Sequence, residues 1–377
     1  MINRDTKLNL KSKNGYFFTM DKKYLDQFRK ELDDFISNDT YFNSRLFAKK
    51  VMFTQEVKSN NTVEGIKDEI TIIEKLIEDA KCISNEERRR RIINLYKGYK
   101  YIMTGEKITE DNVKKLYGIL SEDLLSKEDR TRMGEYYRNA PVYILNCGRL
   151  DDSMRQGIES DKVSEYMKYY FDFINNSYNF NDDSEIFIKS QIMHFYFVHI
   201  HPYFDINGRT SRTIAMWFLL NNNVYPYIIF NRGINFDSSY DKTIRECEDI
   251  CDVTKFLKYM LINTKKELKK EWIMRALSSD VSRDWSAIDY QTLEYFISLK
   301  GNMTVLDFNA LYNRYNDKKK PKEVFETMLF PLIEDGIICV EKETNKVMFD
   351  NTHNMVLSLN KNKLKDLDTS KLTRTNI

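Results

Sequence analysis

The sequence predicts a mainly α-helical protein with one small β-hairpin and a C-terminal winged helix-turn-helix domain. Gly (12) and Pro (5) are scarce in the 377 residues, which argues against a turn-rich all-β sandwich or barrel. Apolar residues recur at spacings of three and four over most of the chain, as in amphipathic helices. Hydrophobic residues (42%) and aromatic residues (13%) are abundant enough to form a core, so wholesale disorder is excluded.

Residues 1–57 are expected to form a polar arm of about 20 residues followed by two helices. The helical spacing of apolar residues begins at Asp21 and includes Leu25 and Phe28. A second helix is expected from Asp39 to about Lys58.

Residues 58–280 are expected to form a helical domain with one interruption. Ser84 and Glu87 form a capping box at the start of one helix. Between Met133 and Asp151 the helical spacing fails and β-forming residues surround a Cys-Gly turn, which predicts a hairpin. The helices are expected at about 66–77, 84–99, 110–120, 160–175, 184–200, from 208 onward and at 252–277.

Residues 281–360 change in character. Helices are expected at 287–299, 305–315 and 322–335, followed by two β-type runs at 337–341 and 346–349. Three short helices and a hairpin in this order are typical of a winged helix-turn-helix. A polar tail, 361–377, is expected to follow.

Composition also limits the functional classes. The formal net charge is +2, so a generally basic surface for nucleic acid is not expected. Five scattered Cys do not form a disulfide framework, and Cys247 and Cys251, one helical turn apart, are better explained as packed thiols than as a zinc site. The sequence has no signal peptide and no run of 18 apolar residues, so we expect a soluble cytoplasmic protein without a membrane span.

The segment from His201 to Arg212 carries the chemistry. Residues before Pro disfavour helical angles, so one helix should end near His201, and the next should begin near Gly208. The free N–H groups at the start of that helix, with Gly208 beside them, form an anion site.

The side chains of this segment suit a polyphosphate. Arg209 and Arg212 are three residues apart, so both guanidinium groups can face the same phosphates. Asp205 offers a hard oxygen ligand for Mg²⁺, and His201 can act as a general base on an incoming hydroxyl. Together these residues predict phosphoryl or nucleotidyl transfer.

The segment resembles the Fic-domain signature, His-Pro-Phe-x-(Asp/Glu)-Gly-Asn-Gly-Arg-x-x-Arg, at every chemically active position. Tyr203 replaces the usual Phe, which is conservative for a ring anchored in the core. Ile206 replaces the usual Gly or Ala, and a β-branched residue would be strained there if the backbone needs a positive φ. The similarity extends over roughly residues 55–265.

The resemblance implies a Fic-type helical core that transfers AMP from ATP to a Ser, Thr or Tyr hydroxyl of a protein and releases pyrophosphate. It implies that His201 deprotonates the hydroxyl and that Asp205 holds Mg²⁺ between the α- and β-phosphates. It further implies that Asn207 fixes the α-phosphate and that the Gly208 N–H contributes to the anion hole.

The same resemblance assigns Arg209 and Arg212 to the outer phosphates and Tyr240 to the adenine pocket. The phosphorylating Doc-like branch typically carries Lys at the position of Gly208, so the glycine favours AMP transfer.

Two further features follow from the resemblance. Residues 134–150 resemble the family's flap, which pairs with the target protein segment as an added strand. The run from Asn60 to Gly65 resembles the family's inhibitory motif, (Ser/Thr)-x-x-x-Glu-(Gly/Asn), in which Glu64 would pair with Arg212 and take it from the γ-phosphate. Asn60 stands where Ser or Thr is usual in this motif. The resemblance also implies a possible homodimer, because the family often forms homodimers that mask the site.

Two alternatives stay open. The chain could be a DNA-binding regulator acting through its winged helix, where Lys318, Lys319 and Lys320 could touch phosphates, although charges after residue 285 are nearly balanced. The same Fic-type site could instead remove AMP from a modified protein, with Glu64 orienting a water.

Overall fold

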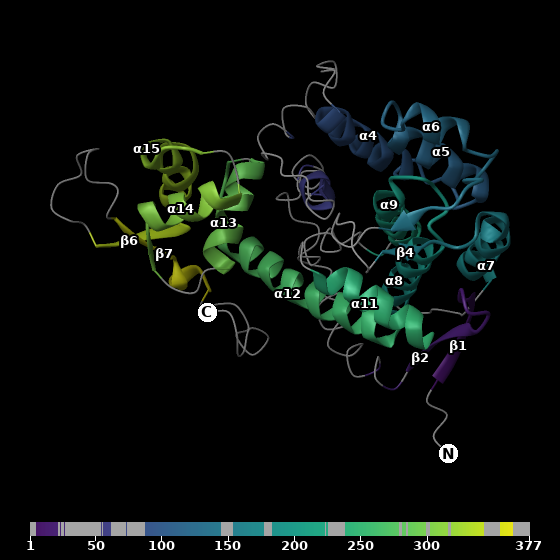
Figure 1. The fold of residues 1–377 in the computed structure, drawn as a ribbon. Helices are drawn as coiled ribbons and strands as arrows, with labels where there is room; N and C mark the ends of the chain where they lie inside the picture. Colours follow the sequence, from purple (N-terminus) through teal and green to yellow (C-terminus); the bar gives the residue numbers. More distant parts are fainter. Residues whose placement is uncertain are drawn as a thin grey trace. The chain divides into compact units, whose positions relative to one another are not determined.

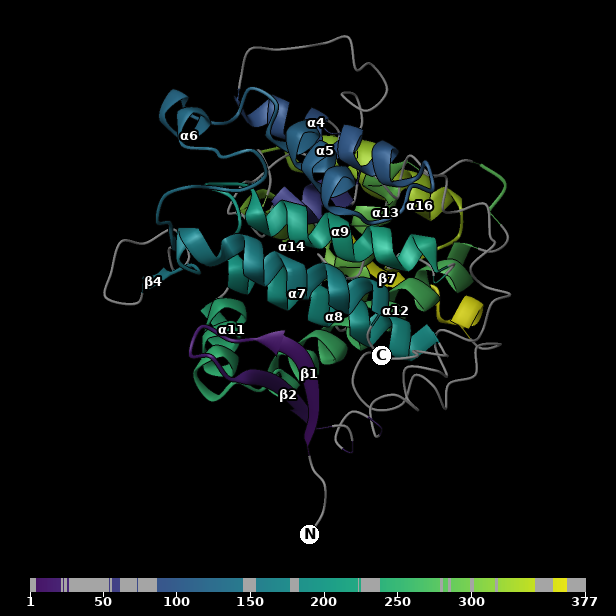
Figure 2. The ribbon, with the colours of Figure 1, turned by 90° about the vertical axis from the view of Figure 1, so that its right-hand side faces the viewer.

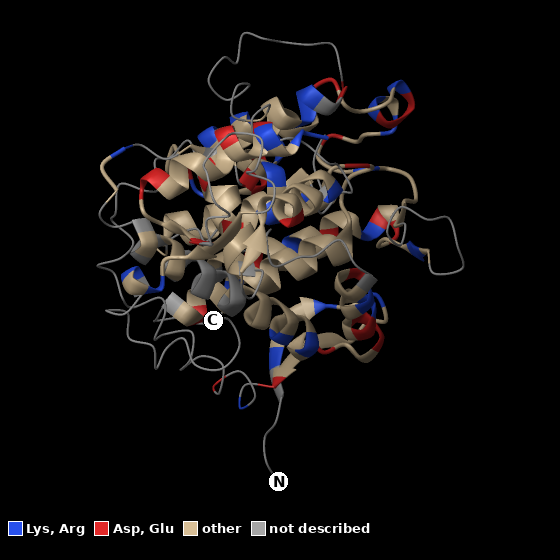
Figure 3. Cartoon of the chain, turned by 90° about the vertical axis from the view of Figure 1, so that its left-hand side faces the viewer, with Lys and Arg blue, Asp and Glu red and all other residues tan. Residues whose placement is uncertain are grey.

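The structure, a computed structural model, is mainly helical and contains three small β-sheets among the residues that it describes (Figure 1). The described residues are 5–21, 23, 26, 54, 56–61, 73, 87–144, 154–176, 183–222, 224, 238–278, 281–283, 286–298, 302–315, 318–342 and 355–364. Within these ranges no helix has both the length and the apolar character needed to cross a membrane. Basic and acidic residues intermix along the helices (Figure 3).

The chain divides into two compact units, which are described separately. Unit 1 comprises 1–38, 59–66 and 79–265, and unit 2 comprises 39–58, 67–78 and 266–377. The division into four segments expected from the sequence stays a prediction. Most of the expected helices at 21–35 and 66–77, the capping residue Ser84 and the tail beyond 364 lie outside the described residues.

Unit 1 is built around α8 (Asp183–Ile200). Every residue from 187 to 200 is buried, as expected for a helix that is apolar on all sides. α8 packs against α7, α9 and α11, and Figure 2 shows α7, α8 and α9 as neighbours. Among the described residues, unit 1 also contains α4 (Glu87–Ile102), α5 (Glu110–Ser121), α6 (Lys127–Thr131), α7 (Val163–Asn176), α9 (Asn207–Asn221) and α11 (Ser238–Ile250). α12 (Thr254–Ser278) contributes residues to both units.

Local signals explain where several of these helices begin. The Thr109 hydroxyl caps α5 by accepting a hydrogen bond from Asn112 N at 3.2 Å. Asp252 Oδ1 accepts from Thr254 N at 2.8 Å, so the cap expected for the 252–277 helix is confirmed. The helices expected at 110–120, 160–175 and 184–200 are confirmed within a few residues.

A buried lysine lies on α8. Lys189 is 6% exposed, and its Nζ donates to the Ile174 carbonyl of α7 at 2.8 Å. The ammonium lies over the rings of Phe173 and Phe218. Burial lowers the pKa of Lys189 to about 8 because the charged form is poorly solvated there.

Residues 5–21 are not a polar arm, so that expectation was wrong for the described part of the N-terminal segment. They form a β-hairpin of β1 (Asp5–Lys11) and β2 (Phe17–Asp21), in which Leu8, Leu10 and Phe18 are buried. The Phe18 ring packs edge-on against Phe195 of α8, with ring centroids 5.2 Å apart. The alternation of apolar residues with period two was the signal for these strands.

A second hairpin pairs β3 (Tyr143–Ile144) with β4 (Arg155–Gln156) in antiparallel register. The sequence predicted a hairpin between Met133 and Asp151, but its second strand lies further along the chain. The β-forming residues 136–138 form no strand, and only an isolated bridge joins Met133 to Arg138. The expected turn at Cys147-Gly148 lies outside the described residues.

Unit 2 contains α13 (Ala287–Ser298), α14 (Val305–Tyr315) and a third helix made of α15 (Pro321–Val324), a π-helical turn (Phe325–Leu329) and α16 (Phe330–Glu334). Strands β5 (Met303–Thr304), β6 (Ile338–Lys342) and β7 (Val356–Leu359) form an antiparallel sheet in the order β5-β7-β6. The three helices expected here are confirmed, as is the first β run. The second expected run, 346–349, lies outside the described residues, and β7 was not expected.

Candidate active site

The predicted loop between two helices is present at residues 201–206. α8 ends where His201 N donates to the Phe197 carbonyl at 3.0 Å, and Pro202 follows. α9 begins at Asn207. The structure therefore brings the sequence-predicted residues from His201 to Arg212 together in one loop and the first turns of one helix.

His201 is held in an uncommon backbone conformation with φ of +54°. Its ring Nδ1 lies 3.3 Å from the Val198 carbonyl oxygen. A carbonyl can only accept, so this contact places the proton on Nδ1 and leaves the lone pair on Nε2. In this tautomer Nε2 is the atom that can accept a proton from a substrate.

Arg138 connects this loop to the β3–β4 hairpin. Its Nε donates to the His201 carbonyl at 2.8 Å, Nη1 donates to the Ala140 carbonyl at 2.8 Å, and Nη2 donates to the Ile158 carbonyl. The side chain is buried, and burial lowers its pKa to about 10. Sequence reasoning assigned residues 134–138 to the flap and missed this role. An arginine directly after two tyrosines was the available signal.

Gly157 follows β4 at the point where the hairpin meets the loop. A Cβ atom there would lie 3.0 Å from Arg138 Nη2, 3.0 Å from Val142 Cγ1 and 3.2 Å from His201 Cβ. Such distances are too short for ordinary contacts, so only glycine fits without displacing these groups. The Ile158 N–H donates to the Ile200 carbonyl at 3.3 Å and joins the hairpin to the end of α8.

Ile206 has φ 65° and ψ 12°, which is the left-handed region. The strain that the sequence suggested for a β-branched residue at this position is therefore present, and it costs about 1–2 kcal/mol. The side chain is buried, and the Asp205 Oδ1 atom accepts from Ile206 N at 2.6 Å. Burial and this hydrogen bond offset part of the strain.

The N-terminus of α9 presents backbone donors. Ile206 occupies the N-cap position and has no polar side-chain atom to accept from the first N–H groups of the helix. The Asn207 amide is committed to the loop, because its Nδ2 donates to the Tyr203 carbonyl at 2.8 Å and its Oδ1 accepts from Tyr203 N at 2.9 Å. Gly208 lies in the first turn of α9. The predicted phosphate contacts of Asn207 and of the Gly208 N–H stay predictions.

Both predicted phosphate-binding arginines, Arg209 and Arg212, are buried. Arg212 Nε donates to Asn60 Oδ1 at 2.8 Å, and Asn60 Nδ2 donates to the Tyr99 hydroxyl at 3.0 Å. The first residue of the predicted inhibitory motif thus contacts the arginine that the motif is expected to occupy. Glu64 itself lies outside the described residues.

Asp205 is suited to a metal carried by a nucleotide. Its side chain is 51% exposed, and Oδ2 lies 3.9 Å from Arg91 Nη2. Among the described residues no three His, Cys, Asp or Glu gather into a metal-binding cluster. A single exposed carboxylate fits Mg²⁺, which normally completes its shell with water and phosphate oxygens. Arg91 was not among the residues that the sequence analysis placed near Asp205.

Tyr203 anchors the loop in the core. Its ring is buried and stacks on Tyr117 with centroids 3.5 Å apart and an interplanar angle of 10°. The conservative exchange of Phe for Tyr therefore keeps the ring in a packed position.

Tyr240 lies on α11 and is buried. Its hydroxyl is 2.7 Å from His194 Nε2 of α8, and the two rings stack. Burial, and next to it the charge of Arg212, hold the pKa of His194 well below its usual range. The adenine contact expected for Tyr240 stays a prediction, because its ring and hydroxyl are engaged between α11 and α8.

The loop at 201–206 and the start of α9 lie in a region that matches a known protein family. The sequence model of the Fic/DOC family matches residues 107–219. No curated protein matches the sequence significantly. Among solved structures, a Fic family protein from Desulfovibrio desulfuricans is similar with a TM-score of 0.53 and 16% identity, over 90% of this chain and 95% of that chain. This likeness concerns the fold.

Two other solved structures are similar to a smaller extent. A segment of Fic-1 from C. elegans has a TM-score of 0.48 and 15% identity, over 69% of this chain and 73% of that chain. A Fic domain containing signaling protein from Bacteroides thetaiotaomicron has a TM-score of 0.47 and 14% identity, over 70% of this chain and 100% of that chain.

Proposed function

We propose that this protein, whose residues 107–219 match the Fic/DOC family model, transfers AMP from ATP to a Ser, Thr or Tyr hydroxyl of a protein. The observation that carries the proposal is the position of His201, whose Nδ1 faces the Val198 carbonyl, at one end of a short loop whose other end is a helix N-terminus. A general base and an anion-binding helix N-terminus at the two ends of one short loop suit attack of an alcohol on a nucleotide phosphate.

In the proposed reaction, His201 Nε2 accepts the proton of the target hydroxyl. The hydroxyl oxygen forms a bond to the α-phosphorus of ATP, the bond between that phosphorus and the α–β bridging oxygen breaks, and pyrophosphate leaves. The hydrogen bond from Nδ1 to the Val198 carbonyl orients the ring and stabilises the imidazolium that forms. A general base of this kind contributes roughly 10²–10⁴ in rate.

Backbone and arginine donors bind the phosphates in this proposal. The Gly208 N–H at the start of α9 faces the anion, and Arg209 and Arg212 bind the outer phosphates. Asp205 would hold Mg²⁺, which neutralises charge on the α- and β-phosphates when it is bound.

We propose that residues 60–65 inhibit the enzyme. The support is the hydrogen bond from Arg212 to Asn60, which places the start of the motif on a phosphate-binding arginine. A Glu64 carboxylate paired with Arg212 would compete with the γ-phosphate for the same guanidinium group. Replacement by glycine should therefore raise activity.

The target protein is proposed to add an extended segment along the hairpin region 134–150, in the way that peptides extend a sheet edge. Strand β3 lies in this region, and Arg138 ties the hairpin to His201. This arrangement would bring the hydroxyl of a paired segment near Nε2. We also propose that two copies of the chain form a homodimer that masks the site.

We further propose that residues 281–360, which belong to unit 2, form a winged helix-turn-helix used for docking partner proteins. The order of α13, β5, α14, the third helix, β6 and β7 supports this fold. DNA binding has weaker support, because Lys319 pairs with Glu323 and Lys322 lies 3.9 Å from Glu326.

Radiolabelled ATP tests the proposed reaction. With Mg²⁺, the Glu64→Gly chain should label protein from ATP carrying ³²P at the α-phosphate but not from ATP carrying it at the γ-phosphate. His201→Ala in the same background should abolish the label. Label from the γ-position would instead mean phosphoryl transfer, and release of AMP from a pre-labelled protein without net labelling would favour the reverse reaction.

A further inference from the structure

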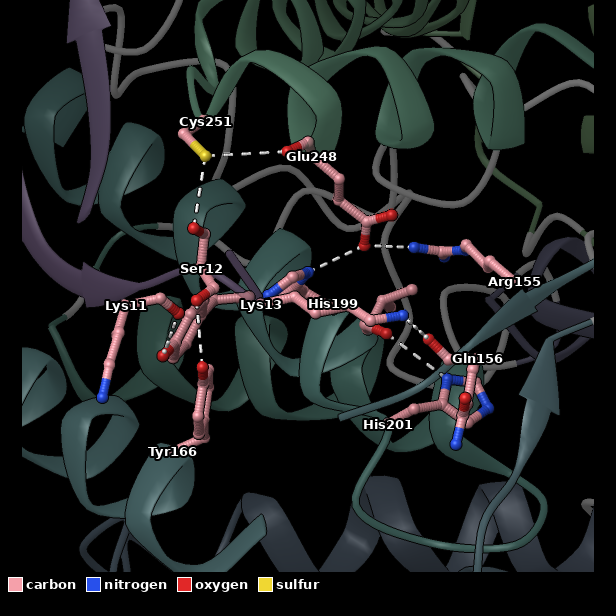
Figure 4. Close-up of polar contacts among 12 residues, drawn as sticks. Lys11, Ser12, Lys13, Arg155, Gln156, Tyr166, His199, His201, Glu248 and Cys251 are labelled. Atoms are coloured by element: carbon pink, nitrogen blue, oxygen red, sulfur yellow. Dashed lines mark hydrogen bonds and ion pairs between the residues drawn. The ribbon is translucent and has the colours of Figure 1, made fainter. Parts of the chain in front are cut away.

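Three charged or titratable side chains from three elements meet behind the active-site loop. Glu248 of α11 points toward His199 of α8 and Arg155 of β4 (Figure 4). His199 Nδ1 donates to Glu248 Oε1 at 2.8 Å, and Arg155 Nη1 donates to the same oxygen. The side chains are 17%, 3% and 15% exposed for Glu248, His199 and Arg155, respectively.

The carboxylate of this cluster is ionised under all ordinary conditions. Burial raises the pKa of Glu248, but the Arg155 guanidinium and the His199 ring outweigh burial and lower it to about 2. Hydrogen bonds to an ionised group are shorter and stronger than neutral ones. Loss of the charge would therefore leave the Arg155 guanidinium without its anionic partner in a mostly buried place.

The cluster contacts strand β4, which leads to the candidate active site. Arg155 belongs to β4. Two residues later, a Cβ atom at Gly157 would lie 3.0 Å from Arg138 Nη2 and 3.2 Å from His201 Cβ, so the backbone there runs close to both residues. His199 lies in the last turn of α8, two residues before His201 in the loop that follows. Glu248 is thus bonded on one side to the hairpin and on the other side to the end of the helix that precedes the proposed base.

The N-terminal hairpin supports the same strand. Lys13 Nζ donates to the Gln156 carbonyl of β4 at 3.2 Å. Ser12 is held by the Tyr166 hydroxyl, which donates to its carbonyl at 2.9 Å, and by Cys251, whose Sγ lies 3.2 Å from its Oγ (Figure 4). β4 is therefore fixed by side chains from two segments far from it in sequence.

We propose that Glu248 is a positioning residue that holds strand β4 in place next to His201. A protein segment paired with the β3–β4 hairpin then presents its hydroxyl to Nε2. The proposal rests on the proposed AMP transfer for its catalytic consequence. Transfer to a protein hydroxyl depends on the hairpin, whereas transfer of AMP to water depends only on the loop and α9. Glu248 therefore affects the acceptor and not the nucleotide.

The test uses full-length chain in the Glu64→Gly background and compares Glu248→Gln with Glu246→Gln. Glu246 lies on the same helix, is 36% exposed and pairs with Lys255, so it controls for loss of an ion pair that does not contact β4. The measured quantities are AMP transferred to the chain's own hydroxyls, AMP released to water and the KM for ATP. Hydrogen exchange at the amides of residues 157 and 158 provides a readout that needs no activity.

For Glu248→Gln we expect protein labelling to fall about tenfold, as for loss of a charged hydrogen bond. The KM for ATP and the release of AMP to water should change by less than about twofold, and exchange at residues 157 and 158 should be at least about tenfold faster. Glu246→Gln should leave all four quantities unchanged.

An equal fall in protein labelling and AMP release, or unchanged exchange at residues 157 and 158, would overturn the positioning role. If the Glu64→Gly background transfers no AMP to any acceptor, the proposed function fails. The exchange measurement then still decides whether Glu248 holds β4.

Discussion

The left-handed backbone of Ile206 can be tested by replacing the residue with alanine and with glycine. Both variants lose the buried side chain beyond Cβ, so they share nearly the same loss of hydrophobic burial. They differ in backbone preference, because φ of 65° strains alanine but not glycine. Relief of strain is worth about 1–2 kcal/mol, and the entropy that glycine gains in the unfolded state costs about 0.4–1 kcal/mol.

The difference between these terms predicts that Ile206→Gly is more stable than Ile206→Ala by about 1 kcal/mol. Urea denaturation of the two variants under identical conditions measures this difference. At a position with ordinary helical or extended backbone, the glycine variant would instead be the less stable by about 0.5–1 kcal/mol. A result of that sign would refute the left-handed conformation of the loop.

Three further predictions concern buried groups. Arg138→Met removes three donors to carbonyl oxygens, so it should lower the free energy of unfolding by at least about 3 kcal/mol, and a loss below about 1 kcal/mol would contradict the contacts. Gly157→Ala should lower the free energy of unfolding by about 1–3 kcal/mol, because the alanine Cβ would crowd Arg138 and His201. The same variant should reduce AMP transfer by more than about tenfold, and full activity would contradict the close approach of these groups. The pKa of Lys189 is lowered to about 8, so between about pH 8 and 10.4 the unfolded chain binds more protons than the folded chain. The free energy of unfolding should therefore rise with pH over that window, by up to about 3 kcal/mol from Lys189. Lys189→Met should lose this rise, whereas the exposed control Lys168→Met should keep it, and identical pH profiles for all three chains would refute the assignment.

The helices around the site were predictable because their signals are local. A long apolar run gives α8, Pro202 explains where it stops, and the helical spacing resumes in α9. The N-terminal hairpin was missed because Leu8 and Leu10 are few apolar residues in a polar stretch, and their burial comes from packing on α8 rather than from local composition.

The loop that joins α8 to α9 could also be predicted from the sequence, as could the strain at Ile206. Contacts between distant segments could not. Arg138 reaches His201 across 63 positions, Asn60 reaches Arg212 across 152, and Arg155 reaches Glu248 across 93. Such pairs depend on how helices and hairpins pack, which the spacing of residues along one chain does not encode.

The central claim is that one loop binds the phosphates of ATP at the start of α9 while His201 Nε2 receives a proton. A crystal structure of the Glu64→Gly chain with Mg²⁺ and a non-hydrolysable ATP analogue tests it most directly. The account predicts electron density for the triphosphate at the Gly208 N–H and the Arg209 and Arg212 guanidinium groups, with Nε2 directed at the open face of the α-phosphate. A nucleotide bound elsewhere, or an imidazole turned away from that phosphate, would contradict the account.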